Sequence, residues 1–145
     1  MGETIFLAKY SPTGTLLWVQ TGIAPFVNND GFGLAVQPVT GMVFVTGRAG
    51  NDVTFSSADG SQHTVPGPGT WHMYLVKYDQ NGNFQWGEWN QANPNSVGHK
   101  VAVDNSNSAY VTGWFESSAT FHSADGNDVA VTGLSGPVQT APDYP

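Results

Sequence analysis

Four histidines and eleven acidic residues could supply acid–base or metal chemistry, whereas the sequence contains no cysteine. The histidines, at positions 63, 72, 99 and 122, form no HExxH pattern and have no carboxylate at a spacing typical of a zinc site. Thiolate ligands and cysteine nucleophiles are excluded, and neither a GxSxG elbow nor a phosphate-binding glycine loop is present. The sequence therefore predicts no catalytic residues, no metal site and no cofactor. Ligands that converge from distant loops are the alternative, with His63 and His72 as the pair to inspect.

Aspartates and asparagines gather in three short segments, residues 28–31, 79–83 and 123–128. Calcium prefers oxygen ligands, but none of these segments has the twelve-residue EF-hand pattern with its closing glutamate. Asx side chains that cap β-turns explain the same composition. We interpret the segments as turns, with calcium binding as the open alternative.

Three tryptophans stand apart from the rest of the aromatic residues. Trp71, Trp89 and Trp114 have no aromatic counterpart elsewhere in the chain, whereas Trp18 and Trp86 occupy equivalent places in a repeated pattern. Unrepeated aromatics near strand ends and loops are typical of surfaces that stack sugars or bind proteins. They are the candidate ligand-binding residues, and local packing of long loops is the alternative.

Charge argues against two classes of partner. The formal net charge is −7, and the four basic residues are scattered at positions 9, 48, 77 and 100. A surface that binds nucleic acid needs clustered Lys and Arg, and no apolar run reaches the roughly 20 residues that span a bilayer. We therefore expect neither nucleic-acid binding nor membrane insertion. The first ten residues show no secretion signal.

The sequence contains an internal repeat, and the strands of that repeat determine where these residues lie. Residues 5–18 align with 73–86, 31–37 with 98–104, and 43–60 with 109–126, and half of the positions in the last pair are identical. The three matches are collinear. They predict one repeat in residues 3–70, a second in 71–136, and a tail or the start of a further blade in 137–145.

Each repeat shows apolar–polar alternation interrupted by turn residues, which is typical of strands. We expect four strands per repeat: two that form a hairpin, a short third, and a fourth that begins at VFVTG or AYVTG and ends near the shared SADG turn. A blade of a β-propeller is a four-stranded antiparallel sheet. The predicted fold class is all-β, with two four-stranded antiparallel blades.

The combination of KY, a glycine turn and Trp with an AVD strand and YVTG resembles the bacterial β-propeller repeat family called SBBP. The resemblance covers residues 3 to 131, with departures at Ser11 and Gln37, where the second repeat has the family-like Asp79 and Asp104. It implies blades on large secreted or cell-surface bacterial proteins, with no catalytic set to carry over. An extracellular or cell-surface location is therefore expected.

Two blades do not close a ring of the usual four to eight, so we expect the missing blades to come from self-assembly or from a longer parent chain. The leading functional hypothesis is a non-catalytic interaction or scaffold module with a protein partner. A lectin-like module that binds glycans through exposed tryptophans is the alternative, and a propeller hydrolase is a third reading.

Overall fold

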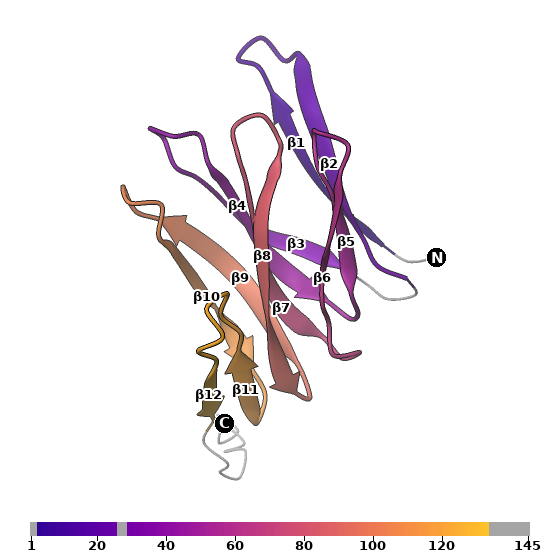
Figure 1. The fold of residues 1–145 in the computed structure, drawn as a ribbon, viewed down its shortest axis with the longest axis vertical. Coiled ribbons are helices and arrows are strands. Elements are labelled where there is room, and N and C mark those ends of the chain that lie inside the picture. The colour runs from indigo at the N-terminus through magenta and orange to yellow at the C-terminus, as the bar shows by residue number, and fades with distance from the viewer. Residues whose placement is uncertain (1–2, 26–28, 134–145) are drawn as a thin grey trace, which may run out of the picture.

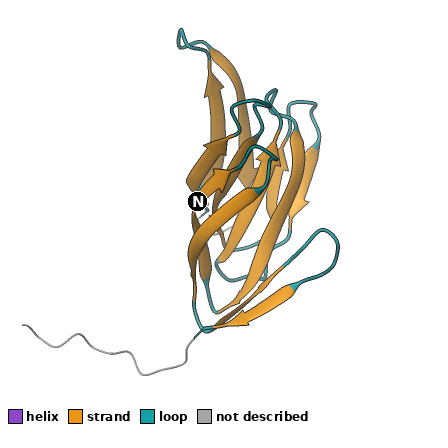
Figure 2. Cartoon of the chain, turned by 90° about the vertical axis from the view of Figure 1, so that its left-hand side faces the viewer, coloured by secondary structure: helices purple, strands orange, loops and turns teal. Residues whose placement is uncertain are grey.

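The computed structural model describes residues 3–25 and 29–133 of the chain, and these residues contain twelve β-strands and no helix (Figures 1 and 2). The first repeat supplies six strands: β1 (Thr4–Tyr10), β2 (Leu16–Ile23), β3 (Asp30–Val36), β4 (Val43–Ala49), β5 (Val53–Ser56) and β6 (Gln62–Val65). The second supplies the corresponding six: β7 (His72–Tyr78), β8 (Phe84–Asn93), β9 (Ser96–Val103), β10 (Ala109–Phe115), β11 (Ser118–Phe121) and β12 (Val129–Thr132). The tail 137–145 lies outside the described residues. Among the described residues no helix is long and apolar enough to cross a membrane.

The predicted all-β antiparallel fold class is confirmed, but each repeat has six strands rather than four. The stretch expected to be one long fourth strand breaks after Ala49, and its second half, β5, leaves β4 to pair with β2. β6 lies in a segment that we expected to be loop, and it pairs with β5. Both strands have four residues, which is too short for alternation to stand out from the surrounding turns.

Turns between paired strands follow the glycine pattern of the sequence. In the β1–β2 turn Gly14 has a φ of 83°, and in the β7–β8 turn Gly82 has a φ of 86°. Positive φ is a conformation that glycine adopts without steric cost. The two hairpins are therefore built by the same local chemistry, which explains why the turn positions repeat.

Three sheets result from the pairing (Figure 1). One has the order β1-β2-β5-β6, a second is β9 with β10, and the largest has the order β12-β11-β8-β7-β4-β3. In the largest sheet β4 pairs with β7 along its full length, from Val43 opposite Tyr78 to Ala49 opposite His72. Four neighbouring strands of this sheet, β3-β4-β7-β8, thus come from two repeats: the β3–β4 hairpin from the first and the β7–β8 hairpin from the second.

The main core lies between the β1-β2-β5-β6 sheet and the inner face of β4 and β7. Phe55 of β5 packs against Tyr74 of β7 and Phe84 of β8, with ring centroids 5.6 and 6.2 Å apart. The buried members of this cluster are Ile5, Ala24, Val43, Val45, Ala49, Val53, Phe55, Val65, Tyr74, Val76 and Tyr78. The hydroxyl of Tyr74 donates to the carbonyl of Asp30, and that of Tyr78 donates to the carbonyl of Ser56. Both buried hydroxyls are therefore satisfied, and burial raises the pKa of each phenol.

Candidate functional site

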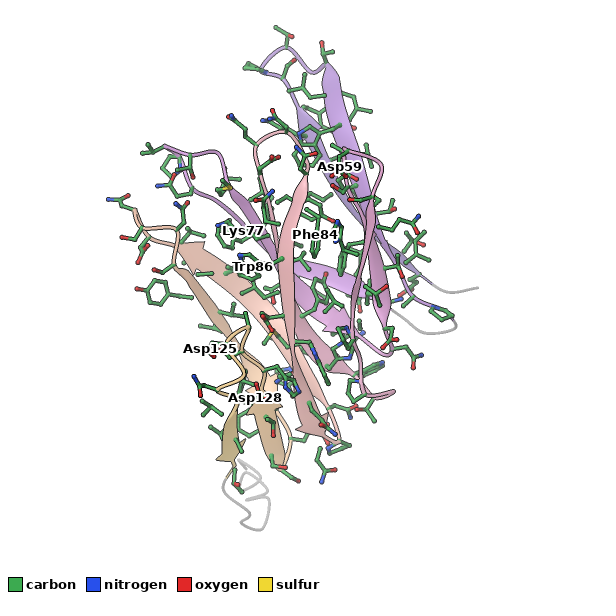
Figure 3. All side chains as sticks on the ribbon, viewed as in Figure 1. Asp59, Lys77, Phe84, Trp86, Asp125 and Asp128 are labelled. Carbon is green, nitrogen blue, oxygen red and sulfur yellow. The ribbon has the colours of Figure 1, made fainter. Side chains whose placement is uncertain are left out.

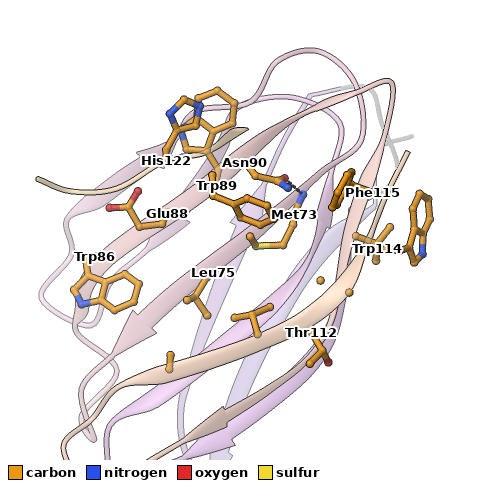
Figure 4. A pocket seen from close by; sticks show the side chains of 16 residues that line it. Met73, Leu75, Trp86, Glu88, Trp89, Asn90, Thr112, Trp114, Phe115 and His122 are labelled. Carbon is orange, nitrogen blue, oxygen red and sulfur yellow. Dashed lines mark hydrogen bonds between the residues drawn. The ribbon is translucent and has the colours of Figure 1, made fainter. Parts of the chain in front are cut away.

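A cleft with a volume of about 590 Å³ opens between the β7–β8 hairpin and the β9–β10 hairpin, with the end of β11 at its rim (Figure 4). Its walls are mainly apolar. Met73 and Leu75 come from β7, Trp86 and Trp89 from β8, and Val111 and Trp114 from β10. Alternation places Met73 and Leu75 on one face of β7, because successive side chains point to opposite sides of a strand. The size and the apolar lining are typical of a binding pocket.

The base of the cleft is held by a buried polar network. The side-chain oxygen of Asn90 accepts from the hydroxyl of Ser96 at 2.6 Å and from the backbone N–H of Met73 at 3.0 Å. The same N–H also lies 3.0 Å from the Ser96 hydroxyl oxygen. Both side chains are almost fully buried. The network ties β7, β8 and the start of β9 together, so the cleft has a rigid floor.

One rim of the cleft is polar. The ring of His122 packs against Trp89 at a centroid distance of 4.1 Å, and its Nδ1 lies 2.7 Å from the carboxylate of Asp128. The backbone N–H of Ser123 and the imidazole of His122 hold the pKa of Asp128 below its usual value. Partial burial raises the pKa of Glu88 beside them. Glu88 is the one residue with a carboxylate among those that line the cleft.

The three candidate tryptophans do not share one location. Trp89 and Trp114 both line the cleft. Trp71 lies elsewhere and packs against the guanidinium of Arg48, which is 4.0 Å from the centre of its ring. The same guanidinium pairs with Asp30 at 2.7 Å. Trp71 therefore takes part in a local cation–π arrangement, whereas the other two tryptophans border a common space.

The histidines are dispersed over the fold. His63 stacks on Phe84 with ring centroids 4.5 Å apart, and His72 is fully buried beside Trp89. His99 lies against Phe32, and His122 lies at the cleft. In residues 3–25 and 29–133 no group of three His, Asp or Glu side chains is placed to hold a metal ion.

Two of the three aspartate-rich segments, 79–83 and 123–128, form tight turns in which the carboxylates bind their own backbone. Oδ1 of Asp79 accepts from the N–H groups of Asn81 and Asn83, and Oδ1 of Asp125 accepts from the Ser123 hydroxyl and the Asn127 N–H. These hydrogen bonds lower the pKa of Asp125 to about 2. Figure 3 shows Asp59 and Asp125 on separate turns. The segment 28–31 begins outside the described residues, and its last two residues, Asp30 and Gly31, are the first two of β3, so this part is strand and not the turn that we expected.

Sequence reasoning missed part of the cleft wall. It assigned Trp86 and Phe121 to structural packing, yet both line the cleft. Lys77 was expected to extend over apolar surface, and its ammonium lies 5.3 Å from the ring centre of Phe44 and 6.0 Å from that of Trp86. Figure 3 labels Lys77 and Trp86 close to each other. The repeat itself was the signal that could have found them, since residues buried in the core of the first repeat correspond to residues that line the cleft of the second.

No family model matches the chain. The chain is 30% identical over 112 residues to an uncharacterized WD repeat-containing protein of Acanthamoeba polyphaga mimivirus. The match covers 76% of this chain but 8% of the relative, so the chain spans a small part of that protein's length. WD repeats build antiparallel four-stranded blades. Together with the antiparallel sheets and the sheet shared between repeats, this similarity indicates that the chain has an all-β, propeller-like repeat fold.

Proposed function

We propose that this chain is a non-catalytic interaction and scaffold module built from propeller repeats of the SBBP type. One observation carries the proposal: β4 of the first repeat and β7 of the second pair over seven residues and merge two repeats into one sheet. Repeats of this kind associate edge to edge, because backbone hydrogen bonds of an open strand give affinity and the flanking side chains give selectivity.

The cleft supports an interaction role for the second repeat. It combines apolar walls with an open strand edge. β10 pairs with β9 on one side, and its other edge pairs with no strand among the described residues. An open edge beside an apolar cleft offers a partner both hydrogen bonds and buried area. A protein segment in an extended conformation fits these two features together.

The carboxylates support a non-catalytic reading. A glycoside hydrolase of the usual kind needs two carboxyl groups across the reacting bond. Glu88 has no second carboxylate among the residues that line the cleft, and Asp59 and Asp125 accept hydrogen bonds within their own turns.

Sedimentation velocity over a wide range of protein concentration tests the proposal. We expect the sedimenting mass to rise with concentration for the wild-type chain and to stay at the monomer value for Val111→Asp, which buries a charge at the docking surface. Val39→Asp adds the same charge at an exposed loop position and is expected to behave as the wild type. A chain that is monomeric at every concentration contradicts the proposal.

A carbohydrate-binding module is the second candidate function, favoured by the presence of Trp86, Trp89 and Trp114 in one cleft beside Glu88 and Asn90. Aromatic faces stack on sugars, and carboxylate and amide groups bind hydroxyls. A glycan array followed by a tryptophan fluorescence titration tests it. Binding that is lost in Trp114→Ala but kept in Trp71→Ala favours this function, and no binding on the array argues against it.

The proposed location is extracellular or at the cell surface. It rests on the resemblance of the repeat pattern to SBBP sequences. Immunodetection in the fractions of the source cells is the direct test.

A further inference from the structure

The cleft of the second repeat occupies the same place as the filled core of the first. Its walls are formed by the counterparts of residues that are buried in the main core. The corresponding pairs are Ile5 and Met73, Val43 and Ala109, Val45 and Val111, Ala49 and Phe115, and Phe55 and Phe121. The cleft is therefore the second repeat's equivalent of the main core, without the strands that fill the core in the first repeat.

The component that fills the interface in the first repeat is the β7–β8 hairpin. β7 runs beside β4 and places Tyr74, Val76 and Tyr78 in the core, where they are almost fully buried. Phe84 of β8 adds a ring that stacks on Phe55. The filling strand thus belongs to the next repeat unit, not to the repeat that it completes.

The β1–β2 hairpin is the counterpart of β7–β8 and presents the same face to solvent. Phe6 and Tyr10 correspond to Tyr74 and Tyr78, and they are 73% and 60% exposed, whereas Tyr74 and Tyr78 are 0% and 1% exposed. Leu16 corresponds to Phe84 and is also exposed. Within the described residues β1 pairs only with β2, so its other edge is open.

We propose that the β1–β2 hairpin of a second copy of this chain docks in the cleft, with β1 antiparallel to β10. The inference rests on the proposed interaction function and names its partner. The register follows from β4 and β7, where Phe44 lies opposite Lys77, Val45 opposite Val76 and Thr46 opposite Leu75. The equivalent contacts place Tyr110 opposite Lys9, Val111 opposite Ala8, and Thr112 opposite Leu7.

The side chains on the two edges fit this register. Lys77 lies over the ring of Phe44, and Lys9 would lie over the ring of Tyr110 in the same way. The Tyr78 hydroxyl donates to the carbonyl of Ser56 at 3.1 Å, and the counterparts are the Tyr10 hydroxyl and the carbonyl of His122. Two contacts are lost: the Tyr74 hydroxyl bond to Asp30, since Phe6 has no hydroxyl, and the ring stacking of Phe84 on Phe55, since Leu16 has no ring.

A second copy satisfies the geometry because both open edges lie on the same chain. The contact is head to tail, so each added copy again presents one open β1 and one open β10, and the series ends when a ring closes. Each chain supplies strands for about two blades, so three or four copies give six or eight blades, within the usual range for propellers.

Cysteine cross-linking tests the register, since the chain has no cysteine of its own. A tagged copy with Val111→Cys is mixed with an untagged copy with Ala8→Cys and oxidised, and the linked heterodimer is measured by mass. The control replaces Ala8→Cys by Lys9→Cys, which lies one position along β1 and points to the other face. Opposite residues of antiparallel strands have Cβ atoms close enough to form a disulfide. Circular dichroism verifies that each variant is folded.

We expect the Ala8→Cys mixture to give at least about ten times more heterodimer than the Lys9→Cys mixture, because only its side chain lies opposite Val111. Equal yields, or association of the wild-type chain with no cross-link, overturn this inference and leave the proposed interaction function standing. A wild-type chain that stays monomeric overturns both. Capture of a glycan in the cleft without association also overturns the inference and favours the lectin-like function.

Discussion

Phe55 and Phe121 hold the same position in the two repeats, yet Phe55 is 2% exposed and Phe121 is 37% exposed. The residues around them are also similar, and the difference comes from what stands opposite. Tyr74 and Phe84 cover Phe55, whereas Phe121 faces the cleft. In this fold a repeat therefore does not complete its own core, and burial is decided by the neighbouring unit.

The largest expected contrast comes from removing these two rings. Phe55→Ala should lower the free energy of unfolding by about 3–5 kcal/mol, the usual cost of a large core cavity. Phe121→Ala should cost about 1 kcal/mol in a dilute monomer, because much of its ring already contacts water. Urea unfolding of both variants at low protein concentration measures the difference. Equal losses would show that Phe121 is buried to the same extent in solution.

Gly22 lies on β2, directly across the strand pair from Phe55 in the same sheet, and extends the comparison of the two repeats. A Cβ at Gly22 would meet the ring of Phe55, whereas the second repeat has Asn90 at the corresponding position. Gly22→Ala should cost about 1–3 kcal/mol by overpacking. Ile23→Ala, at an exposed neighbouring position, should change stability by less than about 0.5 kcal/mol. A neutral Gly22→Ala in thermal or urea unfolding would mean that the Phe55 ring can move away.

Substitutions of Tyr10, which ends β1, and Tyr78, which ends β7, distinguish an effect on stability from an effect on association. Tyr78→Phe should lower the free energy of unfolding by about 1 kcal/mol, because it removes the hydrogen bond from the buried Tyr78 side chain to the half-buried Ser56 carbonyl. Tyr10→Phe should leave the stability of the monomer unchanged and weaken association several-fold in sedimentation velocity. If Tyr10→Phe associates as tightly as the wild-type chain, the proposed bond to His122 does not form.

The smallest effect concerns pH and the first residue of β7. Burial lowers the pKa of His72, so the folded chain resists protonation at this position while the unfolded chain binds a proton near the ordinary value of about 6.5. This contribution to stability is present above that pH and is lost as the pH falls below it. Its counterpart in β1 is Thr4, which does not titrate.

Unfolding measured at pH 7.5 and 5.5 tests this contribution. The wild-type chain should lose stability between the two values, and His72→Gln should lose less. The difference between the two pH values is the readout, because the substitution also changes packing. An unchanged pH dependence in His72→Gln would show that the imidazole is protonated in the folded chain.

Sequence reasoning predicted the all-β antiparallel fold because hairpin turns and alternation are local properties, visible at Gly14 and Gly82 and in the strands beside them. It did not predict β5 and β6 as separate strands, because their partners are set by the packing of Phe55 and Val65 in the core and not by local pattern. The transfer of β5 from β4 to β2 is a tertiary effect that outweighs the local pattern.

The candidate site was only partly accessible from sequence. Trp89 and Trp114 were singled out because they lack counterparts, and they line the cleft. Trp86 was set aside because it repeats, although repetition says nothing about whether the neighbouring unit is present to cover it. Trp71 is equally unrepeated but packs on Arg48, so lack of a counterpart did not by itself mark a cleft residue.

The pairing of β4 with β7 means that the repeating stretch of sequence and the four-stranded sheet are out of phase. A duplication that inserts one whole repeat therefore adds one more sheet between the existing ones. The open strands at the two ends, β1 and β10, stay the same. An array built in this way lengthens or shortens by whole repeats without any new contact having to arise. If the chain were cut at a repeat boundary, each cut would expose two complementary strand edges, one like that of β4 and one like that of β7. The two pieces could then pair again through the same strands.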